Sequence, residues 1–154
     1  MYWLAKEDFA RTVPLTWHRT AQDESGHPAE EERVVVKEAT WRQKGRLHAL
    51  TFALPNDAET GVSGTLVLRV EPEAVMLTRF GDVTWNHTFA AGLTFSSTLR
   101  MGELWLDVVS DTETVDVEIH PHGGTVRVAY RMTIGDVAQQ VALSLQFGDN
   151  AVNG

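Results

Sequence analysis

Apolar and polar residues alternate along most of this chain with a period of two. In the segment 126–134, Val, Val, Tyr, Met and Ile occupy every second position. Successive side chains of a strand point to opposite faces, so this pattern predicts strands with one face on a core and one in water. Strand segments are predicted at 13–17, 34–41, 47–54, 65–70, 75–80, 83–89, 93–101, 103–109, 114–120, 126–134 and 137–147.

Ten or so short strands joined by tight turns, without a convincing long helix, predict an all-β fold. The antiparallel arrangements that suit this pattern are a sandwich and a barrel, and periodicity does not choose between them. A chain of 154 residues suits one domain. We expect an N-terminal arm at 1–12, a barrel domain at 13–148 and a frayed tail at 149–154. The polar segment 22–33 is predicted to be a loop, with its acidic run Glu30–Glu32 in solvent.

Charge and composition exclude several classes of protein. The net charge of −8 argues against non-specific nucleic-acid binding, which needs a basic surface. The absence of cysteine excludes disulfides, thiolate catalysis and Cys-based zinc sites, and it fits a reducing compartment. The first residues lack a secretory pattern, and no apolar run approaches the length of a spanning helix. We therefore expect a soluble cytoplasmic protein with neither a membrane nor a nucleic-acid partner.

Three stretches resemble a known family, the YwiB-like bacterial proteins. They are "VMLTRFGDVTWNHTF", "MGELWLDVVSDTETVDVEIHPHGGTVRVAY" and "MTIGDVAQQVALSLQF". The similarity covers about 80 residues well and about 130 in outline. It implies a single calycin-type barrel of about 8–10 antiparallel strands, similar in shape to lipocalins, in a cytoplasmic protein without an established activity. The family tends to have Tyr and Thr where this chain has Ser97 and Leu99.

A ligand site in such a barrel needs an apolar lining with a few convergent polar groups. Three polar side chains stand in otherwise apolar rows, namely His87, Tyr130 and Gln139. Each also has a purely structural interpretation: a core histidine bonded to backbone, a core tyrosine with a bonded hydroxyl, and a glutamine at the solvated rim. Trp85, in the same row as His87, and Arg79, across the turn, complete the predicted ligand-binding set.

The direction of Arg79 depends on the hairpin around Gly81. A two-residue loop pairs Phe80 with Val83 and turns Arg79 outward. A three-residue loop pairs Arg79 with Val83 and turns Arg79 inward, and a glycine in a left-handed conformation makes this loop common. We favour the second register. An inward arginine must be paired or hydrated, which makes it either an anchor for a ligand carboxylate or half of a structural ion pair.

No catalytic constellation, cofactor motif or metal-ligand set emerges from the sequence. His120 and His122 stand two apart without an obvious third ligand. Three functions therefore remain open. The favoured one is a non-enzymatic module that binds a small apolar or amphipathic ligand, which predicts a lumen larger than about 300 Å³. The second is an interaction barrel, acting through its outer face or as a homo-oligomer, with an interior filled by Trp17, Trp41, Trp85 and Trp105. An enzyme is the least favoured.

Overall fold

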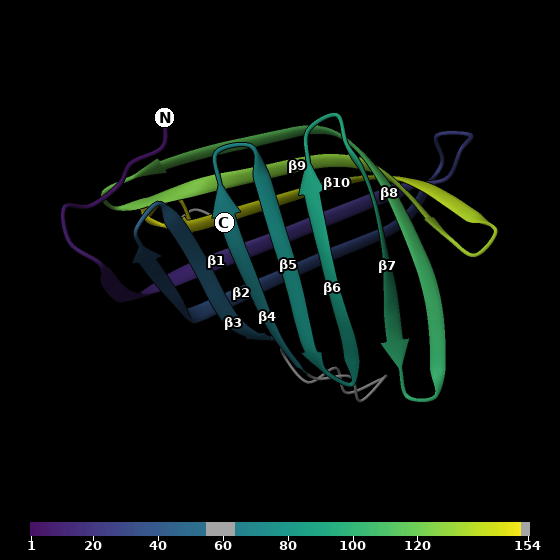
Figure 1. Cartoon of the computed structure of the whole chain (residues 1–154), viewed down its shortest axis with the longest axis horizontal. Helices are drawn as coiled ribbons and strands as arrows, with labels where there is room; N and C mark the ends of the chain where they lie inside the picture. The colour runs from purple at the N-terminus through teal and green to yellow at the C-terminus, as the bar shows by residue number, and fades with distance from the viewer. Residues whose placement is uncertain (55–63, 152–154) are drawn as a thin grey trace.

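The computed structural model describes residues 1–54 and 64–151, and strands dominate it (Figure 1). None of its helices, within that part of the chain, is long and apolar enough to span a bilayer. One short 3-10 turn, η1 (Asp149–Ala151), follows the last strand. The ten strands of the described residues are β1 (Phe9–Gln22), β2 (Pro28–Lys44), β3 (Leu47–Leu54), β4 (Gly64–Glu71), β5 (Ala74–Gly81), β6 (Val83–Ala90), β7 (Thr94–Met101), β8 (Leu104–His120), β9 (Gly123–Ile134) and β10 (Val137–Gly148).

The strands form one closed antiparallel barrel. Each pairs with the next along the chain, and β1 pairs with both β2 and β10, so the order β1-β10-β9-β8-β7-β6-β5-β4-β3-β2 returns to its start. This confirms the predicted all-β antiparallel barrel and decides between the sandwich and the barrel in favour of the barrel. Closure pairs the first strand with the last, which removes the free edges that an open sheet would expose.

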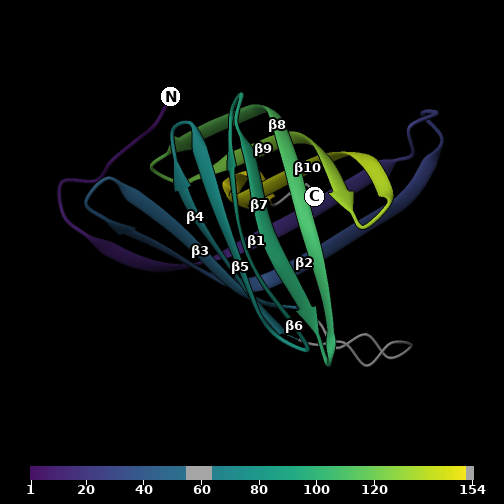
Figure 2. The same ribbon diagram turned by 45° about the vertical axis from the view of Figure 1, so that its right-hand side comes forward.

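Two long strands bend so that the barrel is flattened into two layers. β3–β7 cross β1, β9 and β10 steeply, and the 17-residue strands β2 and β8 belong to both layers (Figures 1 and 2). β8 pairs with β7 from Leu104 to Asp111 and with β9 from Val108 to His120. The segments expected at 103–109 and 114–120 are therefore one strand. A register shift between Thr112 and Thr114 marks the change, because the extra residue of a bulge bends its strand.

One end of the barrel is filled by aromatic side chains. Trp41 is fully buried, and its ring centroid lies 5.0 Å from that of Phe147 and 5.1 Å from that of Phe9. The indole N–H of Trp41 donates to Nδ1 of His48, 3.0 Å away. That bond makes Nδ1 an acceptor, so Nε2 carries the proton and donates to the carbonyl of Trp3 at 2.7 Å. Burial lowers the pKa of His48, which keeps its ring neutral.

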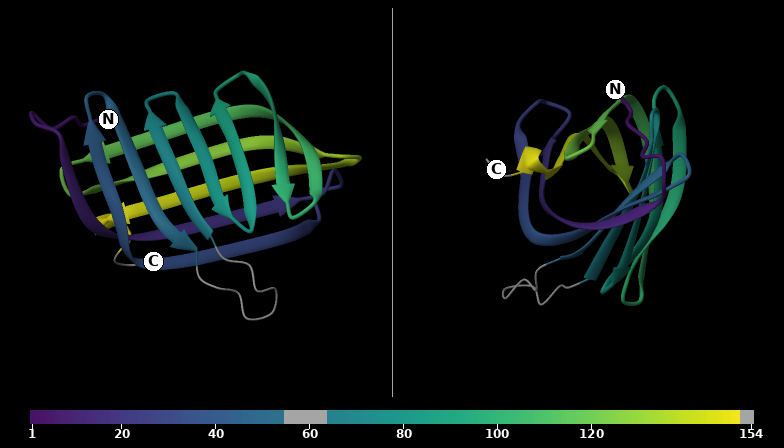
Figure 3. Two further views of the ribbon diagram at one scale, coloured as in Figure 1. Left: turned by 60° about the horizontal axis from the view of Figure 1, so that its bottom comes forward. Right: turned by 90° about the vertical axis from the view of Figure 1, so that its left-hand side faces the viewer.

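The N-terminal arm covers this filled end. β1 begins at Phe9, so the arm is 1–8 and not the expected 1–12. The arm is bound along its length: the backbone of Met1 and Trp3 bonds to Ile119, the amide of Ala5 donates to the side chain of Gln43 at 2.6 Å, and the carboxylate of Asp8 accepts the amide N–H of Gly45 at 3.0 Å. In the end-on view of Figure 3 the arm runs along the rim of the ring of strands. At the other terminus Ala151 is buried, and 152–154 lie outside the described residues.

The end of the polar segment 22–33 was wrongly predicted to be loop, although its acidic run is exposed to solvent as expected. β2 begins at Pro28, so Glu30, Glu31 and Glu32 are strand residues paired with β1. A strand tolerates three successive carboxylates here because the facing strand supplies partners: Glu31 contacts the ring of His18 at 3.0 Å, and Glu30 forms an ion pair with Arg19 at 2.8 Å. Opposite charges across a strand pair stabilise the pairing. The prediction from polarity alone therefore placed the start of this strand too late in the chain.

Candidate functional site

The hairpin between β5 and β6 places Arg79 on the inner face of the barrel. Leu77 pairs with His87 and Arg79 pairs with Trp85, so neither of the two expected registers occurs. The three-residue loop would pair Arg79 with Val83, whereas the observed partner, Trp85, lies two residues further along β6. A shift of two keeps every side chain on its face, because the faces of a strand alternate with a period of two. Arg79 therefore points inward with Trp85 and His87, as the favoured register implied.

A cavity of about 280 Å³ lies inside the barrel, away from the aromatic end. It is slightly smaller than the lumen expected of a binding module. Trp17 and Trp85 stand in its wall, Trp41 fills the opposite end, and Trp105 is exposed outside. The interior is therefore partly filled and partly open. Of the described residues, nine apolar side chains and five polar ones line the cavity: Trp17, Leu54, Leu66, Leu77, Val83, Trp85, Leu99, Met132 and Ile134, with Arg19, Glu30, Glu32, Arg79 and Tyr130.

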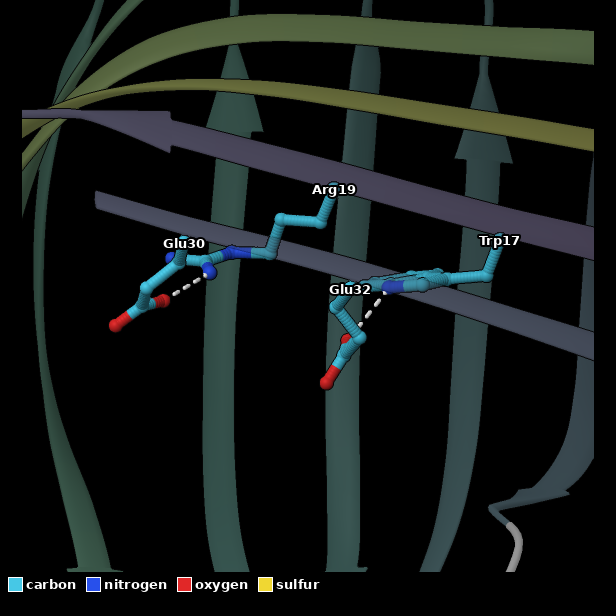
Figure 4. Close-up of polar contacts among 4 residues, drawn as sticks. All are labelled: Trp17, Arg19, Glu30 and Glu32. Atoms are coloured by element: carbon cyan, nitrogen blue, oxygen red, sulfur yellow. Dashed lines mark hydrogen bonds and ion pairs between the residues drawn. The ribbon is translucent and has the colours of Figure 1, made fainter. Parts of the chain in front are cut away.

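Polar pairs from β1 and β2 line one side of this cavity (Figure 4). Nη1 of Arg19 lies 2.8 Å from Oε2 of Glu30, and the indole N–H of Trp17 donates to Oε1 of Glu32 at 2.8 Å. The side chain of Arg19 is only 17% exposed, whereas that of Glu30 is 56% exposed. The carboxylates therefore reach toward solvent while their partners lie deeper. This side of the cavity is where it meets water.

Tyr130 lies beside Arg19 at the base of this polar side. The tyrosine is 2% exposed, and burial raises the pKa of its hydroxyl. Burial also acts to lower the pKa of Arg19, but the neighbouring Tyr130 and Glu30 outweigh it, so the pKa of the guanidinium is raised. Arg19 is therefore charged and Tyr130 neutral across the physiological range. Tyr130 joins Arg79 and Trp85 as the three predicted residues that the cavity brings together.

His87 is buried beside the cavity rather than in its wall. Its Nδ1 lies 2.5 Å from Oγ of Ser97, and its Nε2 lies 2.6 Å from Oγ of Ser110. Ser97 also accepts the indole N–H of Trp85 at 2.8 Å. Burial lowers the pKa of His87 to about 4, so the ring is neutral at pH 7. His87 is thus a buried histidine whose ring contacts serine hydroxyls, and the backbone partner expected of a core histidine is not the one present.

These hydrogen bonds cross a weak seam in the barrel wall. In the described structure, β6 and β7 pair only at Val83 with Met101 and at Thr84 with Arg100. His87 from β6 reaches past this gap to serines on β7 and β8. These side-chain hydrogen bonds thus replace part of the backbone pairing that is missing between β6 and β7. The family difference noted at position 97 falls on this network, so the serine has a polar role of its own.

Gln139 lies apart from the other candidates. It pairs with Met132 near the turn between β9 and β10, and its side chain is partly exposed. It lines a polar surface depression together with residues of the β1–β2 turn, among them Asp23 and Glu24, and with Arg131. The rim position offered as the alternative for this glutamine is therefore the observed one. The structure does not bring it to the cavity of Arg79.

Sequence reasoning missed Arg19, Glu30 and Glu32. They could have been found from the β1–β2 hairpin, in which directly paired residues point to the same face of the sheet. Arg19 pairs directly with Glu32, so both point to one face, together with Trp17 two residues earlier. Glu30 and Glu32 are two positions apart along β2, so both point to this face, whereas Glu31 points to the opposite face. Once the acidic run is placed in a strand, the two cavity carboxylates follow from the alternation.

The fold and its interior define a ten-stranded antiparallel barrel with one plugged end and one small cavity. The chain matches the family model of a domain of unknown function, DUF1934, over residues 18–145, and it belongs to that family. A solved structure, the YwiB protein from Bacillus subtilis, superposes with a TM-score of 0.78 at 16% sequence identity, covering 90% of this chain and 92% of the other. The match to the family model confirms the expected family, and the structural similarity confirms the expected fold. A comparison with curated proteins gave no significant match.

Proposed function

We propose that this protein is a non-enzymatic module that binds one small amphipathic molecule inside its barrel. The observation that carries the proposal is the cavity of about 280 Å³, which has an apolar wall and a polar side. Binding sites for small molecules are typically concave, mainly apolar and equipped with a few polar groups that fix orientation. The absence of cysteine fits a cytoplasmic setting, and we place the module there as part of the same proposal.

The division of the interior supports a single binding position. Aromatic packing around Trp41 and the bound arm fill one end, and the cavity that the described residues enclose lies toward Arg19 and Arg79. A volume of about 280 Å³ equals the liquid volume of about nine water molecules. The occupant is therefore small, with an apolar body against the leucine-rich wall and a polar end.

Native mass spectrometry of the protein purified from its own host tests this function. We expect a small molecule to co-purify in stoichiometric amount. Leu99→Trp fills the cavity from β7 and should abolish this binding, whereas Val35→Trp, at an exposed position of β2, should retain it. Equal occupancy in both variants contradicts binding in the cavity. A wild-type protein that carries nothing, and takes up no apolar fluorescent probe, contradicts the function as a whole.

A second candidate function rests on the exposed end of the β7–β8 hairpin. Met101, Leu104 and Trp105 are all substantially exposed there. Adjacent exposed apolar side chains are typical of interaction surfaces. If the barrel acts through this hairpin as a homo-oligomer, size-exclusion chromatography with light scattering should give a dimer or larger species that Leu104→Asp converts to a monomer. A monomeric wild-type protein favours the cavity as the functional site.

A further inference from the structure

We infer that the ligand of this barrel carries a carboxylate that binds Arg79. The inference rests on the proposed binding function and adds the chemical class of the ligand to it. It comes from the charges that line the cavity, which among the described residues are two cationic and two anionic. Arg19, Glu30 and Glu32 each have a partner within the protein, whereas the buried Nε of Arg79 has none among those residues.

The charges on the β1–β2 side are satisfied. Arg19 and Glu30 form an ion pair at 2.8 Å. Glu32 accepts the indole N–H of Trp17, and it is exposed to water. No ion pair involves Arg79 among the described residues, and its Nε is buried without a hydrogen-bond acceptor there. Leaving a buried charged donor unsatisfied is costly, so a guanidinium in this position favours an acceptor supplied from outside the chain.

The neighbours of Arg79 on the inner face offer it no acceptor. Leu66 pairs with it from β4, Trp85 pairs with it from β6, and Leu77 precedes it by two residues on β5. The indole N–H of Trp85 is a donor and is already bonded to Ser97. An apolar surround of this kind lowers the local dielectric constant and strengthens any ionic contact made inside it. The surround therefore favours an anion over a neutral polar group.

The shape of the guanidinium selects among anions. Its planar fork of N–H donors matches a carboxylate, which can accept two parallel bonds. A carboxylate attached to an apolar chain also suits the remaining wall, where Leu77, Leu99 and Met132 offer no polar atom apart from sulfur. A methylene group occupies about the space of a water molecule, so the cavity has room for about eight carbons and a head group.

Isothermal titration with three eight-carbon probes tests the inference. Octanoate, 1-octanol and octylamine share one body and differ only in the head group. We expect octanoate to bind wild type about tenfold to a hundredfold more tightly than octanol, the range expected for hydrogen bonds to a charged group. Arg79→Gln should reduce the affinity for octanoate to the level of octanol and leave octanol itself unchanged. The affinity of Arg79→Lys for octanoate should lie between those of wild type and Arg79→Gln, because lysine keeps the positive charge but lacks the planar pair of N–H donors.

The matched control is Arg69→Gln, since Arg69 is an exposed arginine on β4 and should leave all three affinities unchanged. Circular dichroism melts confirm that each variant is folded. Equal binding of octanoate and octanol, an unchanged octanoate affinity in folded Arg79→Gln, or tightest binding of octylamine each overturns the carboxylate while leaving a binding barrel intact. Failure of all three probes to bind folded wild type overturns the carboxylate and the binding function together.

Discussion

The buried histidine of the β6–β7 seam makes the stability of this barrel depend on pH. His87 is 2% exposed and is held between Ser97 and Ser110. In the unfolded chain its pKa is near the ordinary value of 6.5, whereas burial lowers the folded-state pKa to about 4. Between these two values the unfolded state binds more protons than the folded state. The free energy of unfolding is therefore fully present above pH 6.5 and falls as the pH falls toward 4.

The size of this effect follows from the two pKa values. Each unit of difference is worth about 1.4 kcal/mol, so the loss approaches about 3 kcal/mol at pH 4 and reaches about 2 kcal/mol at pH 5. Urea titrations at pH 7.5 and pH 5.0 measure it. His87→Gln lacks the titrating ring, so we expect it to lose about 2 kcal/mol less than wild type between these two conditions.

The comparison between variants separates His87 from the other titrating groups. All other titratable groups are the same in wild type and in the variant, so their contribution cancels in the difference. Val35→Gln is the control, because Val35 is exposed on β2 and carries no titratable group. We expect this control to show the pH dependence of wild type. Equal losses in wild type and folded His87→Gln would refute the argument from burial.

Three further predictions concern the filled end and the arm. Trp41→Ala should cost about 3–5 kcal/mol in urea denaturation, whereas Trp105→Ala, at an exposed position, should cost less than about 1 kcal/mol; similar costs would contradict the packing described. Gln43→Ala removes the bonds to Ala5, so we expect about 1–3 kcal/mol of destabilisation and faster tryptic cleavage within the arm, and unchanged cleavage would show that the arm is held otherwise. Gly124→Ala places a methyl 2.8 Å from a buried aromatic ring and 2.5 Å from a backbone oxygen, so its melting temperature should fall, and an unaltered melt would contradict this close approach.

The alternation of side chains determined much of the architecture from the sequence alone. It predicted the strands, the antiparallel all-β class and the inner rows that contain Trp85, His87 and Tyr130. It also gave the correct face for Arg79, although the register of that hairpin was wrong by two residues. The predicted face of Arg79 was still correct, because side chains alternate between inside and outside with a period of two and a register shift of two residues leaves each on its face.

Tertiary structure decided which inner residues meet in a cavity. Arg79 lies opposite the polar pairs of β1 and β2 because β2 and β8 bend across both layers, and no local pattern specifies how layers separated along the chain face each other. The same holds for His87, whose environment was decided by Ser97 and Ser110 on two other strands. The sequence thus assigned side chains to faces. Barrel closure and long-range packing decided which of those faces are filled by aromatic rings and which enclose space.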